Sequence, residues 1–242
     1  MFDMNALKPS ASVEISDFDE DRVSSPRSFV QESGVYPMTI EMAHLGITNN
    51  GATFLKVHFK ETDLGGINHY ETFYLTNKEG RNTYRDKDGK DRYIPGFAQA
   101  NTLSLLCTGK YLYDLDFQKK TIKQYDYAAK EERNVQVDVA MDLLKKNVHL
   151  GLLKVIENKR VKDANGNWVS GNDKRELNTI GKIFAEDGRT LNEIQAKHPT
   201  GDYLKGWSDK HTGTVVDKYK PVRTAPAAPA PMPPPSTESL FD

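Results

Sequence analysis

The sequence has few of the residues and patterns that signal export, membrane insertion or cysteine chemistry. Cys107 is the only cysteine in 242 residues, which excludes an intrachain disulfide and a cysteine-rich zinc site. No apolar run approaches the roughly 20 residues that a membrane-spanning helix needs. The first 22 residues are acidic and lack the basic and apolar segments of a secretory signal. We therefore expect a cytoplasmic protein with no membrane partner.

Signatures of catalysis and metal binding are equally scarce. The chain has no glycine-rich phosphate loop followed by lysine, no G-x-S-x-G and no H-E-x-x-H. The acidic turn between Asp86 and Asp91 lacks the full spacing and the closing glutamate of a calcium loop. His44 and His58 are candidates to face each other on neighbouring strands, but no nearby carboxylate completes a ligand set. We predict a protein that is not an enzyme and uses no metal or other cofactor.

Composition divides the chain into a folded body and two acidic ends. Residues 1–33 carry three basic against seven acidic side chains and few apolar ones, which is typical of an irregular arm. Residues 34–220 carry 29 basic against 25 acidic side chains, a small excess whose placement matters more than its size. We expect one folded domain over residues 34–205 and an irregular extension over 206–223. An Ala/Pro-rich disordered linker with an acidic, apolar tip follows over 224–242.

Alternation of apolar and polar residues predicts three strands joined by short turns, over residues 34–47, 52–61 and 69–76. Asn50 and Gly51 supply the turn between the first two strands. In the first strand the alternation places Tyr36, Met38, Ile40 and Met42 on one face.

The rest of the chain is predicted to hold a helix, followed by further strands and two short helical segments. Pro95 and Gly96 open a helix that Gly109 ends. A long hairpin turns at Asn165 and Gly166. The remaining expectations are a possible strand over 121–127, a short helix over 139–147, hairpin strands over 149–161 and 176–184, and a helical turn over 191–197.

Three strands, a helix and then a long hairpin follow the order of a five-stranded oligonucleotide-binding (OB) barrel. We therefore predict a mainly β, α+β fold, namely a modified five-stranded OB-fold barrel with one or two helices and disordered termini. A generic β-sandwich or an irregular α+β fold is the alternative.

The strand over residues 52–61 carries the most informative pattern. Leu55, Val57 and Phe59 share one face and form ordinary core. The other face alternates rings with cations, as binding of single-stranded nucleic acid requires, because rings stack on bases and cations contact phosphates. An exposed β face of common strand residues is the alternative interpretation. The candidate residues here are Phe54, Lys56, His58 and Lys60, with Tyr70 and Tyr74 on the next strand.

Two polar loops extend this candidate surface. A tryptophan in the polar turn of the long hairpin is either folded back onto the body or offered to a ligand. The excursion after the third strand contains arginines and tyrosines, and its basic side chains are interspersed with acidic ones. A solvated charged loop is therefore the alternative interpretation there. No zinc finger, basic leucine zipper or helix-turn-helix is present, which favours binding of single strands with little base preference. The candidates are Lys159, Arg160, Lys162 and Trp168 in the hairpin, and Arg81 and Arg92 in the excursion.

The layout of the chain over residues 34–205 resembles the single-stranded-DNA-binding replication proteins of double-stranded-DNA bacteriophages. The stretches that carry the resemblance are residues 33–61, 143–161 and 174–194. The resemblance implies an OB barrel that coats single strands during DNA replication, recombination and repair in the host cell cytoplasm. It also implies a flexible C-terminal tail that recruits replication partners such as a polymerase, a helicase or primase, or the sliding clamp.

The tip of the tail is the candidate partner-binding segment. Its Ser-Leu-Phe sequence is similar to the end of the bacterial sliding-clamp-binding pentapeptide, with Thr237 where that peptide has glutamine. The alternatives are a tip that plugs the basic groove and a terminus without a partner. For the whole protein, the rival functions are a β-rich virion or assembly protein and a clamp adaptor that does not itself bind DNA. The tip comprises Glu238, Ser239, Leu240, Phe241 and Asp242.

Overall fold

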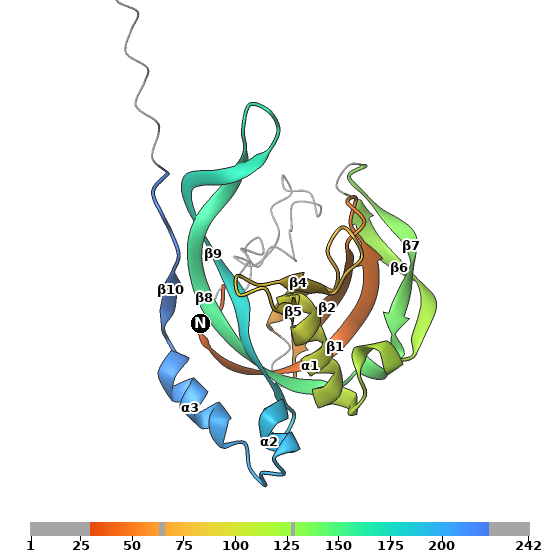
Figure 1. Ribbon diagram of the computed structural model, residues 1–242, viewed down its shortest axis with the longest axis vertical. Helices are drawn as coiled ribbons and strands as arrows, with labels where there is room; N and C mark the ends of the chain where they lie inside the picture. Colours follow the sequence, from red (N-terminus) through yellow and green to blue (C-terminus); the bar gives the residue numbers. More distant parts are fainter. Residues whose placement is uncertain (1–29, 63–65, 127–128, 223–242) are drawn as a thin grey trace, which may run out of the picture.

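The computed structural model describes residues 30–62, 66–126 and 129–222. Within these residues the fold is mainly β, as predicted. One curled, mostly antiparallel sheet of eight strands carries a separate two-stranded hairpin, and three α-helices pack at its sides (Figure 1). The predicted tail over 224–242 and nearly all of the acidic arm lie outside the described residues.

The first three strands form the predicted meander. β1 (Gly34–Ile47) pairs with β2 (Thr53–Glu61), which pairs with β3 (Asn68–Tyr74), and both pairings are antiparallel. Gly51 takes a positive φ of 85° in the β1–β2 turn, a conformation that suits glycine because it has no Cβ.

One residue in β1 departs from the predicted alternation. Ile40 is opposite Phe59 and Met42 is opposite His58, so Glu41 is an extra residue and forms a β-bulge. Beyond the bulge, residues that the unbroken alternation would turn toward the core face outward, and their neighbours face inward. The prediction that Met42 shares a face with Met38 and Ile40 is therefore wrong, and Ala43 is the next fully buried residue.

The helix α1 (Pro95–Thr108) begins and ends as predicted. Gly109 caps it in the left-handed region with a φ of 71° and donates its backbone N–H to the Leu105 carbonyl. A Cβ on Gly96 would lie 2.5 Å from the Tyr74 carbonyl oxygen. The first turn of α1 therefore lies directly against the backbone of β3.

The segment after α1 contains a second hairpin, of which the sequence predicted only part of the first strand. A 3-10 turn, η3 (Leu112–Asp114), leads into β6 (Phe117–Asp126), which pairs along its length with β7 (Glu131–Ala140). β7 was not predicted. The helix predicted over 139–147 is wrong except for a single 3-10 turn, η4 (Met141–Leu143).

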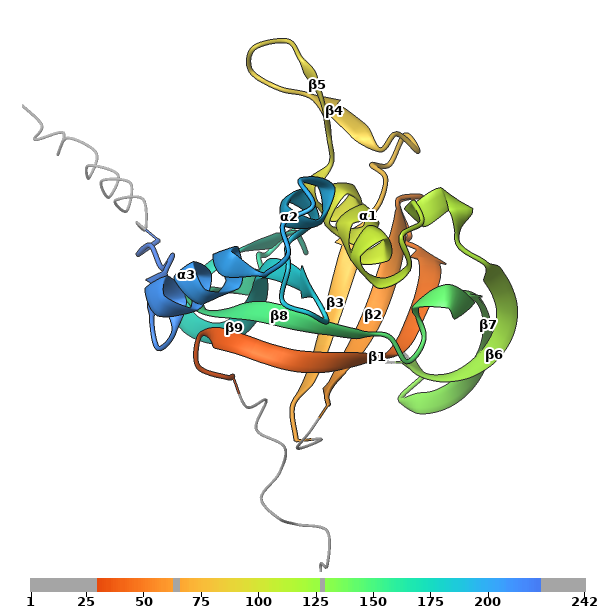
Figure 2. The same ribbon diagram turned by 90° about the horizontal axis from the view of Figure 1, so that it is seen from below.

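The long hairpin consists of β8 (Asn147–Lys162) and β9 (Trp168–Ala185). Both strands are longer than predicted. The excursion after β3 holds the small hairpin of β4 (Thr83–Arg85) and β5 (Asp91–Tyr93), which stands away from the main sheet on the side of α1 (Figure 2).

The residues after 185 belong to the folded body. α2 (Leu191–Gln195) is the predicted helical turn, and its capping box pairs Thr190 with Glu193. The prediction that residues 206–223 are irregular is wrong, because α3 (Asp202–His211) crosses that boundary and β10 (Val215–Asp217) adds in parallel to β8. Trp207 anchors α3 to the sheet. The start of the body also lies earlier than predicted, since Lys154 donates its backbone N–H to the Ser33 hydroxyl.

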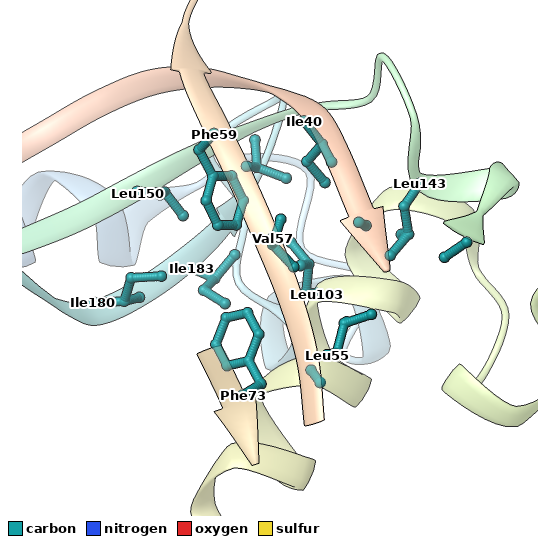
Figure 3. Packing of buried hydrophobic residues seen from close by; sticks show 14 of the residues in the cluster. Ile40, Leu55, Val57, Phe59, Phe73, Leu103, Leu143, Leu150, Ile180 and Ile183 are labelled. Atoms are coloured by element: carbon teal, nitrogen blue, oxygen red, sulfur yellow. The ribbon is translucent and has the colours of Figure 1, made fainter. Parts of the chain in front are cut away.

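The main sheet is curled but not closed. Its central path runs β10–β8–β1–β2–β3, with β9 beyond β8 and the β6–β7 hairpin joined to the second half of β1. β3 and β9 do not pair with each other, and α1 contacts both of them. Figure 3 shows the core beneath α1, where Phe59 and Phe73 from the meander meet Leu103 from the helix and side chains of β8 and β9. The inward residues of β2 (Leu55, Val57 and Phe59) have no exposed surface, as predicted.

Candidate nucleic-acid interface

The register of β2 and β3 brings the candidate residues of both strands onto one outer face. Residues directly opposite each other in an antiparallel pair share a face. Since Leu55 is opposite Phe73 in the core, the alternate residues face outward. We refer to this surface as the outer face. Its cross-strand pairs are Phe54 with Tyr74, Lys56 with Thr72, His58 with Tyr70, and Lys60 with Asn68.

The rings on the outer face contact one another in fixed orientations. The His58 ring stacks on Tyr70, with 4.3 Å between centroids and 5° between planes. Its Nε2 lies 2.8 Å from the Asn68 Oδ1. Phe54 meets Tyr74 edge to face at 6.4 Å. Because Tyr70 remains 61% exposed and Tyr74 52% exposed, both rings offer surface for a flat ligand.

The cations of the outer face are not neutralised by carboxylates. No ion pair between described residues uses Lys56 or Lys60. The nearby Glu41 carboxylate is bound by Lys145 at 2.6 Å; this hydrogen bond lowers the pKa of Glu41, and the charges of Lys145, Lys60 and His58 lower it further. Lys56 and Lys60 therefore have no ion-pair partner among the described residues, although Lys60 lies within the electrostatic reach of Glu41.

His44 lies on the same face as Lys56, buried against the β6–β7 hairpin, and does not form a histidine pair with His58. His44 is opposite Lys56, whereas His58 is opposite Met42. Burial lowers the pKa of His44, and the charge of Lys56 lowers it further, so the ring is neutral at pH 7. In the described ranges no three His, Cys, Asp or Glu side chains are grouped as a metal site would require.

The distal part of the β8–β9 hairpin projects from the sheet (Figure 1). β8 pairs with β1 up to Leu152 and with β10 up to Ile156. The six residues from Glu157 to Lys162 pair only with β9 and span about 20 Å at the usual rise per residue. We call residues 157–175 the distal hairpin.

Trp168 is exposed on the distal hairpin. It is the first residue of β9, opposite Lys162, and not a loop residue as predicted. Its ring is 57% exposed and does not fold back onto the body. The Lys162 ammonium lies 5.4 Å from the ring centroid, and Arg160 donates from Nη2 to the Trp168 carbonyl oxygen at 2.8 Å. The exposed indole and its two cations thus form one cluster.

The β4–β5 hairpin holds its arginines differently. Arg92 is bound to Asp86 in an ion pair that lowers the pKa of that carboxyl group. Arg85 lies 3.5 Å from Asp91. Arg81 stands apart from these pairs and lines a cavity of about 580 Å³ together with Phe97 and Tyr113.

The predicted residues therefore form three groups and not one. Among the described residues no hydrogen bond, ion pair or ring contact connects the outer face, the distal hairpin and the β4–β5 hairpin. Tyr111 and Tyr113 are a further exposed pair that the sequence reasoning missed, stacked at 5.7 Å with Tyr113 78% exposed. Their spacing of two, around the buried Leu112, was the available signal.

The predicted partner-binding tip from Glu238 to Asp242 lies outside the described residues. No helix in the part of the chain that the structure describes has the length and apolar character to cross a bilayer. The chain matches no known protein-family model, and no curated protein is significantly similar to it.

Proposed function

We propose that this protein binds single-stranded DNA with little base preference and acts in phage DNA replication, recombination and repair. The observation that carries the proposal is the outer face, where the β2–β3 register aligns two ring pairs with two lysines that form no ion pair among the described residues. Aromatic rings stack on any base, at roughly 1–3 kcal/mol each, and lysines contact phosphates regardless of sequence. Such a surface binds unpaired strands without recognising their base sequence.

The arrangement of the strands supports a modified OB fold. In that fold strands 2 and 3, with the loops between strands 1 and 2 and strands 4 and 5, bind oligonucleotides. Here β1, β2, β3, α1, β8 and β9 follow the corresponding order, and β1 pairs with both β2 and β8. The β4–β5 and β6–β7 hairpins are then insertions, and the distal hairpin corresponds to the connection between strands 4 and 5.

The distal hairpin extends the proposed surface with a second cluster of ring and cations. Trp168 offers a face for stacking, while Lys159, Arg160 and Lys162 have no carboxylate partner in the described structure. Arg81 and Arg92 of the excursion remain proposed phosphate contacts. The tail from residue 224 onward is proposed to recruit a replication partner, a polymerase, a helicase or primase, or the clamp, through the tip that ends in Leu240, Phe241 and Asp242.

Titration of a fluorescent oligo(dT) at two salt concentrations tests the proposal. Affinity is expected to fall steeply with salt, with a slope of about −0.7 in log–log units per phosphate contact. Phe54→Ala is expected to weaken binding about tenfold, because one base loses its stacking partner. Lys56→Glu/Lys60→Glu is expected to weaken it further.

A matched control is Lys205→Glu/Lys210→Glu, which makes the same change in charge on α3, away from the outer face. It is expected to retain most of the affinity. Equal affinities of the wild type and Lys56→Glu/Lys60→Glu, or equal losses in the two double variants, would contradict the proposal. Absence of salt-sensitive binding would favour a virion component or a clamp adaptor.

A further inference from the structure

A cleft opens beside the outer face, where the β1–β2 turn approaches the β6–β7 hairpin. It has a volume of about 500 Å³, within the range of small-ligand sites. The two hairpins meet where His44 of β1 pairs with Val139 of β7. The cleft is therefore built between the proposed DNA-binding sheet and an insertion that packs against it.

One wall of the cleft is the Phe54 ring, whose position depends on a glycine. Gly46 is opposite Phe54, and a Cβ on Gly46 would lie 2.3 Å from the ring's Cζ. The far end of the ring therefore lies over the bare backbone of Gly46. The edge of Tyr74 supports the ring from the β3 side. Phe54 thus joins the outer face to the cleft.

The opposite wall presents one amide and two valines. Gln124 of β6 lines it with Val135 and Val137 of β7, and the β6–β7 register places these three residues on one face of the hairpin. A primary amide donates and accepts hydrogen bonds, as the free edge of an unpaired base also does. No lysine or arginine lines the cleft, so it offers no cation to a phosphate group.

We propose that this cleft holds one unpaired nucleobase of the bound strand. The base stacks on Phe54, and its hydrogen-bonding edge meets the amide of Gln124. Because an amide serves as donor and acceptor, each of the four bases finds a partner. A base in a duplex cannot enter, since its edge is already paired. The cleft therefore selects single strands, and this inference rests on the proposed function.

A comparison of two ligands separates base binding from phosphate binding. One is oligo(dT), and the other is an abasic strand of the same length that retains every phosphate. Gln124→Ala is expected to bind oligo(dT) about fivefold more weakly, as the loss of one hydrogen bond implies. Its affinity for the abasic strand is expected to stay within twofold of wild type. Gln124 is exposed, so the variant should keep its fold.

Gln118→Ala is the matched control, since this amide lies on the same strand and the same face as Gln124 but does not line the cleft. It is expected to leave both affinities unchanged. Gly46→Ala, which displaces the Phe54 ring, should repeat the selective loss. An equal loss on both strands, or no loss on oligo(dT), would overturn the cleft as a base site while leaving the proposed function intact. Failure of the wild type to bind either strand would overturn both.

Discussion

Two hairpins of similar composition, β4–β5 and the distal part of β8–β9, hold their cations in different ways. In the β4–β5 hairpin Arg92 is paired with Asp86, and Arg85 with Asp91. In the distal hairpin Arg175 is also paired, with Glu157, but Arg160 contacts a backbone carbonyl and Lys162 lies over the Trp168 ring. The availability of a charge thus depends on its neighbours in space, and the number of arginines and lysines in a hairpin does not by itself set its attraction for phosphate.

The largest expected effect comes from removing the cations of each hairpin in turn. Lys159→Gln/Lys162→Gln is expected to weaken oligo(dT) binding about tenfold and to reduce the salt slope by about 1.4, which corresponds to two phosphate contacts. Arg85→Gln/Arg92→Gln is expected to weaken binding less than about threefold, because carboxylates already neutralise both arginines. Fluorescence anisotropy at several salt concentrations measures both. Equal losses of affinity in the two variants would show that the two hairpins do not differ in the availability of their cations.

A smaller effect is expected when Arg92 is released from its partner. Asp86→Asn removes the carboxylate charge but keeps the Oδ1 that accepts the backbone N–H groups of Asp88 and Lys90. The turn should persist, and oligo(dT) affinity should rise about twofold to threefold as Arg92 becomes available. In an Arg92→Gln background the same change should give a smaller gain. An equal gain in both backgrounds would show that Arg92 is not the group released.

The smallest effect concerns pH. Arg92 lowers the pKa of Asp86 below its ordinary value of 3.8, so this carboxylate stays ionised throughout the range from pH 7 to pH 5. A folded-state pKa below the unfolded value gives stability that is present above the unfolded pKa and is lost as pH falls through the folded value. The ratio of oligo(dT) affinities between wild type and Arg85→Gln/Arg92→Gln should therefore be the same at pH 7 and pH 5. A ratio that grows at pH 5 would mean that the pair opens there.

The elements that the sequence predicted correctly share a strong local signal. β2 alternates fully buried and outward residues without interruption, so its period of two is visible in the sequence. α1 begins at Pro95 and ends at Gly109, and both residues act through their own backbone preferences. β8 begins with an apolar run that is buried where it crosses the core.

Most of the missed features depend on partners elsewhere in the chain. β7 is the exception, because Val135, Val137 and Val139 alternate with polar residues and this period of two was available in the sequence. The bulge at Glu41 is invisible locally, because it follows from the register between β1 and β2. β10 has three residues and exists only because β8 offers an edge beyond the end of β1.

In the candidate site, too, some features were visible in the sequence and others required the tertiary structure. The alternation of Phe54, Lys56, His58 and Lys60 was readable from the strand itself. The stacking of His58 on Tyr70 required the β2–β3 register, and the cleft beside Phe54 required the β6–β7 hairpin to meet β1. The neutralisation of Arg92 required the turn that brings Asp86 within reach of it.

By itself, the sequence determined which residues of each strong strand or helix face inward, where α1 begins and ends, and which side chains bear rings and charges. These properties follow from backbone preferences and from a periodicity of a few residues. The tertiary structure alone decided which strands are neighbours, that β3 and β9 remain apart with α1 between them, and which cations remain without a carboxylate. Those outcomes depend on register and on contacts between residues distant in the chain, which no local pattern encodes.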